Sequence, residues 1–481
     1  MSEYVILDID QLNPEPVVQK QCQQLLASTV SRRLLLISYP FEEYWLDVEP
    51  CKRKSRIQLT GLYALEKRDG QISIRFTVTE KGAELCAVVR QATGEHPPSF
   101  SSLCDHFSLP DFHSKDILPL SPINIAKPWG QEIWYTAIEE RGVAGVSNGR
   151  FKLPLPWVLS ALPSSLCADQ QRLLILLKIL DPLPQEVFGD LYFELHQEKR
   201  EVYVVTSINK EAWPKGEGCI RFGFDQYKRK QYSSDRAFRA DFVLAVKDYE
   251  KVRREIDGMI DAFRVRDEFG VNEPVSVDVL RDWLNELPAG LQEDERRLRG
   301  QMDSFTNKLP LALGDVVKVP CLTPHSLQHG VRTIEFQTPV YERLILSFAQ
   351  KVLTQPHWDI DAAAGIMTLG TPEQPLHNRI MDCGGVVVER IVDFKDFEVQ
   401  RILLASGAHF MIPSPDAYGV LIAVKGSLVI GDMELKPEDA AIIPGECDEL
   451  PINNHCSAPI SFLLAFPLGS AESAISPKMG C

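Results

Sequence analysis

The sequence predicts a mainly β protein with two β-rich units, a helical insertion and an additional N-terminal α/β unit. The first observation is a set of short β-like runs, separated by Gly, Pro and Asp, that covers much of the chain. Between about residues 380 and 470 these runs are evenly spaced, as in a small antiparallel barrel. The second observation is a block after Ser234 in which apolar residues recur every three or four positions, the period of an amphipathic helix.

Size and composition narrow the function classes. The chain has 481 residues, which suggests about three domains, and a net charge of -15, which disfavours a nucleic-acid partner. No apolar run reaches the roughly 18 residues of a membrane span. The N-terminus lacks a secretory pattern, so we expect a cytoplasmic protein with no membrane partner. The eleven cysteines contain no CxxC pair, so any metal must be bound by histidine and carboxylate.

The N-terminal unit is predicted to span residues 1–115. Its β-like runs are RRLLLISY, SRIQLTGLYAL and QISIRFTV, and nothing in it looks catalytic. The stretch from Pro97 to Pro119 is rich in Ser, Pro and Asp, and we interpret it as a linker. A first β-rich unit follows from about residue 116 to 235 and contains the strand-like runs LYFELH and EVYVV.

The helical insertion is predicted at residues 236–309. Apolar periodicity indicates three helices: Phe242 to Phe263, Val275 to Leu287, and Gln292 to about Lys308. Because β-like sequence resumes at Asp315, the first β-rich unit is expected to comprise 116–235 plus 310–375, and the second 376–481.

One segment of the first β-rich unit has the residue types of a metal site. Glu194 and His196 are two residues apart, so in a strand they would point to the same face. Residues 197–200 are polar and could form a hairpin turn, which would bring Glu201 close to His196. His325 follows the strand-like GDVVKV much later. Two imidazoles and two carboxylates could hold a catalytic zinc ion, although a solvated surface hairpin and a structural His325 remain alternatives.

Four stretches of the sequence resemble type I mannose-6-phosphate isomerases of the cupin superfamily. The resemblance covers roughly residues 116 to 470, and the helical insertion also lies where this family places its helical domain. The matching stretches are KPWGQEIW at 127–134, LLKIL at 176–180, ELHQEKRE at 194–201, and TPH at 323–325 with Glu335 and Glu342-Arg343.

The resemblance implies two cupin (jelly-roll) β-barrels. The second unit lacks an H-x-H cluster, so we expect no metal there. It implies an isomerase that interconverts mannose 6-phosphate and fructose 6-phosphate with one Zn²⁺ per chain. That reaction moves a proton between C2 and C1 through an enediolate, so it needs a base and an electrophile. The implied residues are Glu194, His196, Glu201 and His325 for zinc, Lys178, Lys199 and Trp129 for the sugar phosphate, Glu335 as the base, and Arg343 beside zinc as the electrophile.

The sequence departs from the family pattern at three points. Glu194 replaces a neutral glutamine, and a second carboxylate would cancel the double charge of the metal. The loop between His196 and Glu201 is shorter than in most relatives. Ala349 stands where the family has a lysine, and Lys351 is the nearest cation. These differences bear on phosphate binding and turnover more than on the fold.

Simpler interpretations compete with each assignment. Glu335 could form an ion pair with Arg332 or Arg343, Arg343 could pair with Glu342, and His329 could replace His325 as a ligand. Lys178 could be a strand-end lysine that extends to solvent, and Lys199 a solvated turn residue. The main alternative function is a non-catalytic cupin that binds sugar phosphate as a binding or regulatory module, and a weaker one is an iron-dependent cupin enzyme. The expected partner is a small-molecule sugar phosphate, and the chain is expected to be a monomer or homodimer.

Overall fold

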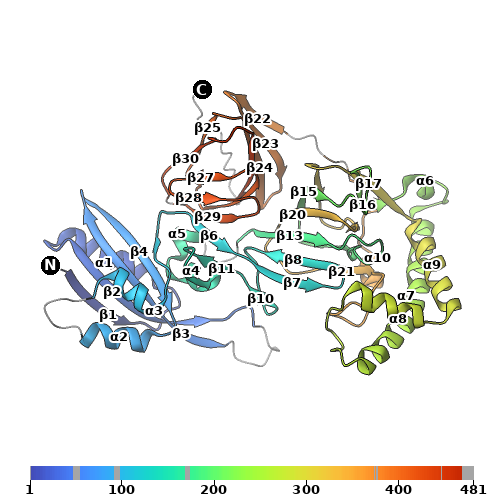
Figure 1. The fold of residues 1–481 in the computed structure, drawn as a ribbon, viewed down its shortest axis with the longest axis horizontal. Coiled ribbons are helices and arrows are strands. Elements are labelled where there is room, and N and C mark those ends of the chain that lie inside the picture. The colour runs from blue at the N-terminus through green and yellow to red at the C-terminus, as the bar shows by residue number, and fades with distance from the viewer. Residues whose placement is uncertain are drawn as a thin grey trace. The chain divides into compact units, whose positions relative to one another are not determined.

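A computed structural model describes residues 2–46, 55–91, 98–167, 174–372, 374, 378–445 and 447–468. The fold is mainly β, and the described residues form six sheets, none of which closes on itself (Figure 1). The chain divides into two compact units: the first contains Met1–Ile123, Trp134–Leu177 and His377–Cys481, and the second contains Asn124–Ile133 and Lys178–Leu376. Within the described residues, no helix is long and apolar enough to cross a membrane.

The first unit begins with a five-stranded sheet in the order β1-β2-β3-β4-β5, in which β1 and β2 run parallel. The predicted β-like runs of this region are confirmed as β2, β3 and β4. The elements are β1 Ser2–Asp8, α1 Glu15–Ala27, β2 Arg32–Glu42, β3 Arg56–Arg68, β4 Gln71–Thr79, α2 Gly82–Gln91, α3 Phe100–Phe107 and β5 Phe112–His113.

The prediction of a linker from Pro97 to Pro119 is wrong. Pro97 lies outside the described residues, and the rest of the stretch contains helix α3, strand β5 and the start of β6. Helix α3 begins after Ser99, whose hydroxyl accepts a hydrogen bond from the backbone N–H of Ser102 over 3.1 Å. The helix buries Phe100, Leu103 and Phe107. Its N-cap and its apolar face therefore outweigh a composition that suggested a loop.

The remainder of the first unit contains a nine-stranded sheet, a four-stranded sheet and a small hairpin. The nine-stranded sheet has the order β12-β11-β6-β29-β26-β31-β24-β23-β22, and the four-stranded sheet has the order β25-β30-β27-β28. Between them lies an apolar core that includes Val388, Ile402, Leu421 and Phe462. The elements are β6 Leu118–Ser121, β9 Ile138–Glu139, β10 Gly142–Val143, β11 Gly145–Ser147, β12 Lys152–Pro154, α4 Leu155–Ala161, α5 Pro163–Cys167, β22 Asn378–Cys383, β23 Val386–Asp393, β24 Phe397–Leu404, β25 His409–Ile412, β26 Tyr418–Lys425, β27 Leu428–Ile430, β28 Met433–Leu435, β29 Ala440–Pro444, β30 Leu450–Asn453 and β31 Ile460–Pro467.

The second unit is built on a six-stranded and a five-stranded sheet. Their orders are β18-β15-β20-β13-β8-β7 and β17-β16-β19-β14-β21. Side chains of both sheets, such as Tyr203 and Phe222, share one apolar core. The elements are β7 Ile123–Lys127, β8 Gly130–Trp134, β13 Leu176–Pro182, β14 Phe193–Leu195, β15 Glu201–Ile208, β16 Gly218–Phe224, β17 Thr306–Leu311, β18 Val316–Val319, β19 His325–Leu327, β20 Val331–Gln337 and β21 Leu344–Ser347.

Three helices are present in the region predicted to be helical, with one correction (Figure 1). They are α7 Asp235–Arg266, α8 Val277–Glu286 and α9 Ala289–Asp303, and the short helices α6 Gln226–Arg229 and α10 Ile360–Ala364 lie outside this region. Ser234 caps α7 by accepting from the N–H of Ala237, and α7 joins the main core through buried Phe238 and Phe242. The third helix, predicted from Gln292 to about Lys308, ends earlier, at Asp303, because Thr306–Leu311 forms β17 and pairs with β16.

Candidate metal centre

The predicted ligands come from two different sheets. Glu194 in β14 lies opposite His325 of β19 in an antiparallel pair, and His196 follows directly after β14. Glu201 begins β15, which belongs to the six-stranded sheet. The predicted hairpin is therefore wrong, because residues 197–200 connect two sheets instead of two neighbouring strands. The site consequently lies where the chain crosses from one sheet to the other.

Three of the four predicted ligands present donor atoms to one another. One ligand atom each of Glu194, His196 and His325 lies within 4.8 Å of the others. Nε2 of His196 is 3.8 Å from Oε1 of Glu194. Both histidines are buried, at 2% exposure each, whereas the side chain of Glu194 is 17% exposed. The group therefore contacts solvent through Glu194.

Glu201, the fourth predicted ligand, contacts two members of this group. Its Oε1 is 3.4 Å from Nε2 of His196, and its Oε2 is 3.1 Å from Nε2 of His325. The ammonium group of Lys199 lies 2.6 Å from Oε1, and the hydroxyl of Tyr203 donates to Oε2 over 2.7 Å. Both carboxylate oxygens of Glu201 are thus already bonded, and Glu201 is not one of the three mutually close residues.

Backbone carbonyls orient both imidazole rings. Nδ1 of His196 lies 2.9 Å from the carbonyl oxygen of Glu342, and Nδ1 of His325 lies 2.9 Å from that of Thr323. Because a carbonyl oxygen can only accept, each Nδ1 must carry a proton and donate it. In a neutral ring the lone pair is then on Nε2, which is the tautomer that binds a metal. Nε2 of His325 can donate to Glu201 over 3.1 Å only when that ring is protonated.

The electrostatic surroundings shift the pKa values of His196, His325 and Glu201 in different ways. Burial and the nearby ammonium of Lys199 lower the pKa of His196 despite its carboxylate neighbours. Burial also opposes charge on His325, but its hydrogen bond with Glu201 raises the pKa of that ring. Burial alone would raise the pKa of Glu201, yet Lys199 and His196 hold it well below its usual value. Glu201 is therefore a carboxylate, with the negative charge that a cation requires.

The residues present fit a divalent metal ion. The buried Nε2 of His196 and Oε2 of Glu194 have no hydrogen-bond partner among the described residues. A buried polar atom without a partner costs about 1–3 kcal/mol, so these two atoms are either strained or meant for a ligand. A bound cation would satisfy both of them. Nitrogen and oxygen donors from His and Glu are the ligands of zinc, and two His with one carboxylate also suit iron.

Glu342 was missed as a site residue. Its Oε1 accepts hydrogen bonds from the backbone N–H groups of Gln197, Glu198 and Lys199, over 2.7, 2.9 and 3.2 Å. Its own carbonyl is the acceptor that orients His196. One residue therefore fixes both the crossing segment and a ligand ring. In the sequence Glu342 stands out only together with Arg343, as a family-like pair and as a possible ion pair, because no spacing rule connects it with residues 197–199.

Glu335 occupies a buried position on β20, opposite Tyr203 of β15, and is 3% exposed. Burial raises the pKa of Glu335 to about 8, the ammonium of Lys178 opposes this shift, and the carboxylate of Glu201 adds to it. Lys178 is buried as well and donates to Oε1 of Gln337 over 3.0 Å. Arg332, one of the two partners considered for Glu335, pairs with Asp181 at 2.7 Å.

The other predicted residues lie in varied surroundings, and their roles stay predictions. Arg343 donates to the hydroxyl of Thr354 over 2.8 Å, and its guanidinium carbon lies 4.7 Å from the ring centre of Tyr192. Trp129 is 1% exposed and belongs to the apolar core of the second unit. Nδ1 of His329 lies 2.7 Å from Asp190, and His329 is not among the three mutually close residues.

Comparison with known proteins supports the fold. Neither a protein-family model nor a curated protein matches the sequence. Among solved structures, mannose 6-phosphate isomerase from Bacillus subtilis has a TM-score of 0.51 at 14% identity, over 73% of this chain and 99% of that one. This chain shares its fold. A likeness at such low identity concerns the fold alone.

Two other solved structures of mannose 6-phosphate isomerases have lower TM-scores. A mutant of phosphomannose isomerase from Salmonella typhimurium has a TM-score of 0.47 at 12% identity, over 73% of this chain and 100% of that one. A mannose 6-phosphate isomerase bound with zinc and yttrium has a TM-score of 0.46 at 12% identity, with the same coverage.

Proposed function

We propose that the chain is a zinc-dependent aldose-ketose isomerase that interconverts mannose 6-phosphate and fructose 6-phosphate, and that its two β-rich units are cupin barrels. The observation that carries this proposal is the convergence of Glu194, His196 and His325 to within 4.8 Å. Beside them, Glu335 has a raised pKa of about 8 and is influenced by Glu201. The fold shared with the Bacillus subtilis enzyme agrees with the proposal.

In the proposed mechanism, Glu194, His196, Glu201 and His325 would hold the ion. When bound, zinc would supply positive charge that stabilises a developing negative oxygen. Glu335 takes the proton from C2 of the aldose, and the electron pair moves to the carbonyl oxygen on C1. Glu335 then returns the proton to C1, while the hydroxyl proton on O2 passes to O1 and leaves the C2 carbonyl. A pKa of about 8 makes both protonation states of Glu335 accessible near neutral pH.

Three cations are assigned to the charges of the substrate. Lys178 and Lys199 are both close enough to Glu335 to lower its pKa. They would attract the phosphate ester and hold it beside the base. Arg343 would stabilise the negative oxygen of the enediolate, because its guanidinium can donate two parallel hydrogen bonds.

The second candidate function is a module that binds sugar phosphate without turning it over. It is favoured by Glu194, whose carboxylate would join that of Glu201 at the ion and cancel its double charge. Oxygen atoms of Glu194 and Glu201 lie 3.8 and 3.4 Å from the same His196 nitrogen. A neutralised cation would still bind ligands but would polarise them less.

One assay separates the two functions. The purified chain is incubated with mannose 6-phosphate, fructose 6-phosphate is measured, and bound metal is quantified by elemental analysis before and after chelation. We expect about one zinc per chain and turnover that disappears with the chelator and returns with zinc. Metal without turnover would support the binding module. Turnover after complete removal of metal would reject the isomerase mechanism.

A Glu335→Gln variant sharpens the assay. The change keeps the size of the side chain but removes its ability to accept a proton, so turnover should fall by at least about 100-fold. Zinc content should stay unchanged, since Glu335 is not one of the proposed ligands. Undiminished turnover in this variant would show that another residue is the base.

A further inference from the structure

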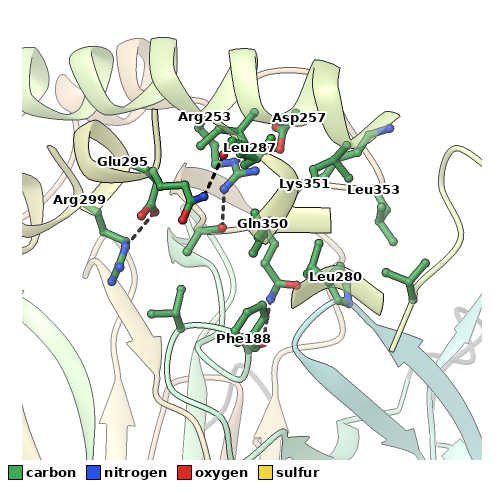
Figure 2. A pocket seen from close by; sticks show the side chains of 18 of the residues that line it. Phe188, Arg253, Asp257, Leu280, Leu287, Glu295, Arg299, Gln350, Lys351 and Leu353 are labelled. Atoms are coloured by element: carbon green, nitrogen blue, oxygen red, sulfur yellow. Dashed lines mark hydrogen bonds and ion pairs between the residues drawn. The ribbon is translucent and has the colours of Figure 1, made fainter. Parts of the chain in front are cut away.

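The helical insertion and neighbouring segments of the second unit line a pocket with a volume of about 220 Å³. Figure 2 shows it between the helices and the segments that carry Phe188 and Gln350, whose side-chain amide donates to the carbonyl of Phe188 over 2.8 Å. None of the predicted ligand, catalytic or substrate-binding residues lines this pocket. Ala349 and Lys351, at and near the position of a family lysine, do line it, but the pocket shares no lining residue with the candidate metal centre.

The walls of the pocket are mostly apolar. Ile256 and Ile260 come from α7, and Leu280 and Leu284 come from α8. These residues belong to or pack against one apolar cluster. A hollow of this kind, with mostly apolar walls and a few polar groups, is a common setting for a small-molecule guest.

Positive charge predominates at the pocket. Among the described residues that line it, five side chains are cationic and three are carboxylates. Two of the carboxylates are already paired: Asp257 accepts from Arg253 over 3.0 Å, and Glu295 accepts from Arg299 over 2.9 Å (Figure 2). Lys351 is paired as well, with Asp261 over 2.7 Å, so one net positive charge is left among these groups for an anionic guest to balance.

Arg264 is the cation with an unmet donor. It is 4% exposed, and one of its terminal nitrogens donates to the carbonyls of Gly270 and Glu273. Its buried Nε has no hydrogen-bond partner among the described residues. The carboxylate oxygen of Asp261 is 4.0 Å from this Nε, too far for a hydrogen bond, and it already binds Lys351 over 2.7 Å.

We propose that this pocket binds a small amphipathic anion, an apolar body with one carboxylate or phosphate group, whose charged end meets Arg264. The apolar walls bury the body, and the guanidinium of Arg264 supplies a charge-assisted hydrogen bond that the protein itself leaves unused. The charge excess at the pocket disfavours a cationic guest, and the apolar walls disfavour a sugar.

Isothermal titration calorimetry on the full chain tests the proposal with octanoate, octyl phosphate and 1-octanol as probes. We expect at least one of the two anions to bind about tenfold or more tightly than the alcohol, because only the anions can form the charge-assisted hydrogen bond. A tenfold difference in affinity corresponds to about 1.4 kcal/mol of binding free energy. The tighter of the two anions identifies the headgroup. Equal affinity for all three probes, or no binding of either anion, would overturn the proposal.

Two leucine variants locate the binding site. Leu284→Trp fills the pocket from α8 and should weaken binding of the preferred anion at least tenfold. Leu244→Trp is the matched control, since Leu244 lies on α7, is 57% exposed and does not line the pocket. Unchanged affinity in a folded Leu284→Trp variant would place the bound anion elsewhere and contradict the assignment.

Arg264→Gln tests the charged contact. The variant should lose most of the preference for anion over alcohol while it keeps affinity for 1-octanol. Because Arg264 also binds two backbone carbonyls, thermal melting followed by circular dichroism must first show that the variant is folded. If it is not folded, the comparison of probes on the natural chain and on Leu284→Trp decides the question. A preserved preference in folded Arg264→Gln would remove Arg264 from the proposed contact.

Discussion

At the level of single residues, the candidate centre depends on how each ring nitrogen is used. His196 and His325 each donate Nδ1 to a backbone carbonyl over 2.9 Å and so direct Nε2 toward the carboxylates. The carbonyls that accept these bonds belong to Glu342 and Thr323, which lie outside the ligand set itself. Orientation by such neighbours commonly changes metal affinity by 10–100-fold.

Replacement of His325 tests the ligand set directly. The His325→Ala variant should lose both bound zinc and isomerase activity, because a three-residue set would fall to two close donors. Elemental analysis of the purified variant is the measurement. His329→Ala is the control, since that buried histidine pairs with Asp190 and should leave the zinc content at its original value. Stoichiometric zinc in the His325→Ala variant would show that a different residue completes the site.

Glu335 should make the stability of the metal-stripped protein depend on pH. Its pKa is raised from 4.5 to about 8, so between these values the folded chain binds more protons than the unfolded chain. The free energy of unfolding should therefore fall as pH rises from about 5 to 8. Glu335→Gln should flatten this slope in urea titrations at several pH values. Glu255→Gln, an exposed position on α7, is the control and should leave the slope as it is.

Residue types and local spacing could be predicted from sequence, but contacts between distant residues could not. Glu194 and His196 stand out because two residues in a strand share a face. His325 was chosen over His329 through its Thr-Pro-His context, and the observed partner of His329 is Asp190. The role of Glu342 arises from three backbone N–H groups in a segment about 145 positions away, and backbone donors leave no trace in a sequence.

At the level of elements, residues 197–200 determine how the ligands of the two sheets are connected. This crossing segment leads from β14 in one sheet to β15 in the other, and Glu342 accepts three of its backbone N–H groups. Successive backbone N–H groups can bind an anion, and here the carboxylate of Glu342 takes the place of that anion and holds the turn. The separation between His196 and Glu201 is therefore set by a side chain that precedes β21.

Variants of Glu342 should separate the contribution of acceptor and charge. Glu342→Ala leaves three N–H groups without their acceptor and should weaken zinc binding by about 10–100-fold. Glu342→Gln keeps an acceptor oxygen at the same reach but removes the charge, so its loss should be smaller. Competition with a chromogenic chelator measures both affinities. Equal zinc affinity in the natural chain and in Glu342→Ala would show that the crossing segment holds its shape without this contact.

The helices and most strands were predictable because each has a local signal. Helix α7 follows from its apolar repeat, and Ser234 gives it an N-cap. The failures occurred where local and distant preferences conflict. The charged sequence of α9 gives way after Asp303 to polar residues with no clear stop signal, and Thr306–Leu311 pairs as β17 with β16. The polar run at 197–200 fits a hairpin or a crossover equally well, and only the packing of two sheets decides between them.

At the level of the whole molecule, the proposed ligands come from two sheets that also share an apolar core. Glu194 and His325 belong to the five-stranded sheet, whereas Glu201 belongs to the six-stranded sheet. That residues so far apart in sequence meet could be anticipated only through the resemblance to a known family. Hydrophobic periodicity alone indicates that strands exist, and it does not say which strands become neighbours.

Removal of metal should therefore lower the stability of the second unit. A ligand that binds only the folded chain adds about 2.7 kcal/mol at one hundred times its dissociation constant. We expect chelation to lower the melting temperature measured by calorimetry, and zinc to restore it. The Glu335→Gln variant should respond to the chelator like the natural chain, because it keeps the ligands. A melting temperature that ignores chelation in protein shown to contain zinc would contradict a role of the ion in joining the sheets.

The partial exposure of Glu194 has a consequence for how the ion enters and leaves. Both histidines and Glu201 are buried, so a cation that enters the site would meet the side chain of Glu194 first. A carboxylate at this entrance should attract a dissolved cation and retain it more strongly than a neutral amide would. Glu194→Gln should thus speed the escape of a bound zinc ion to a chelator.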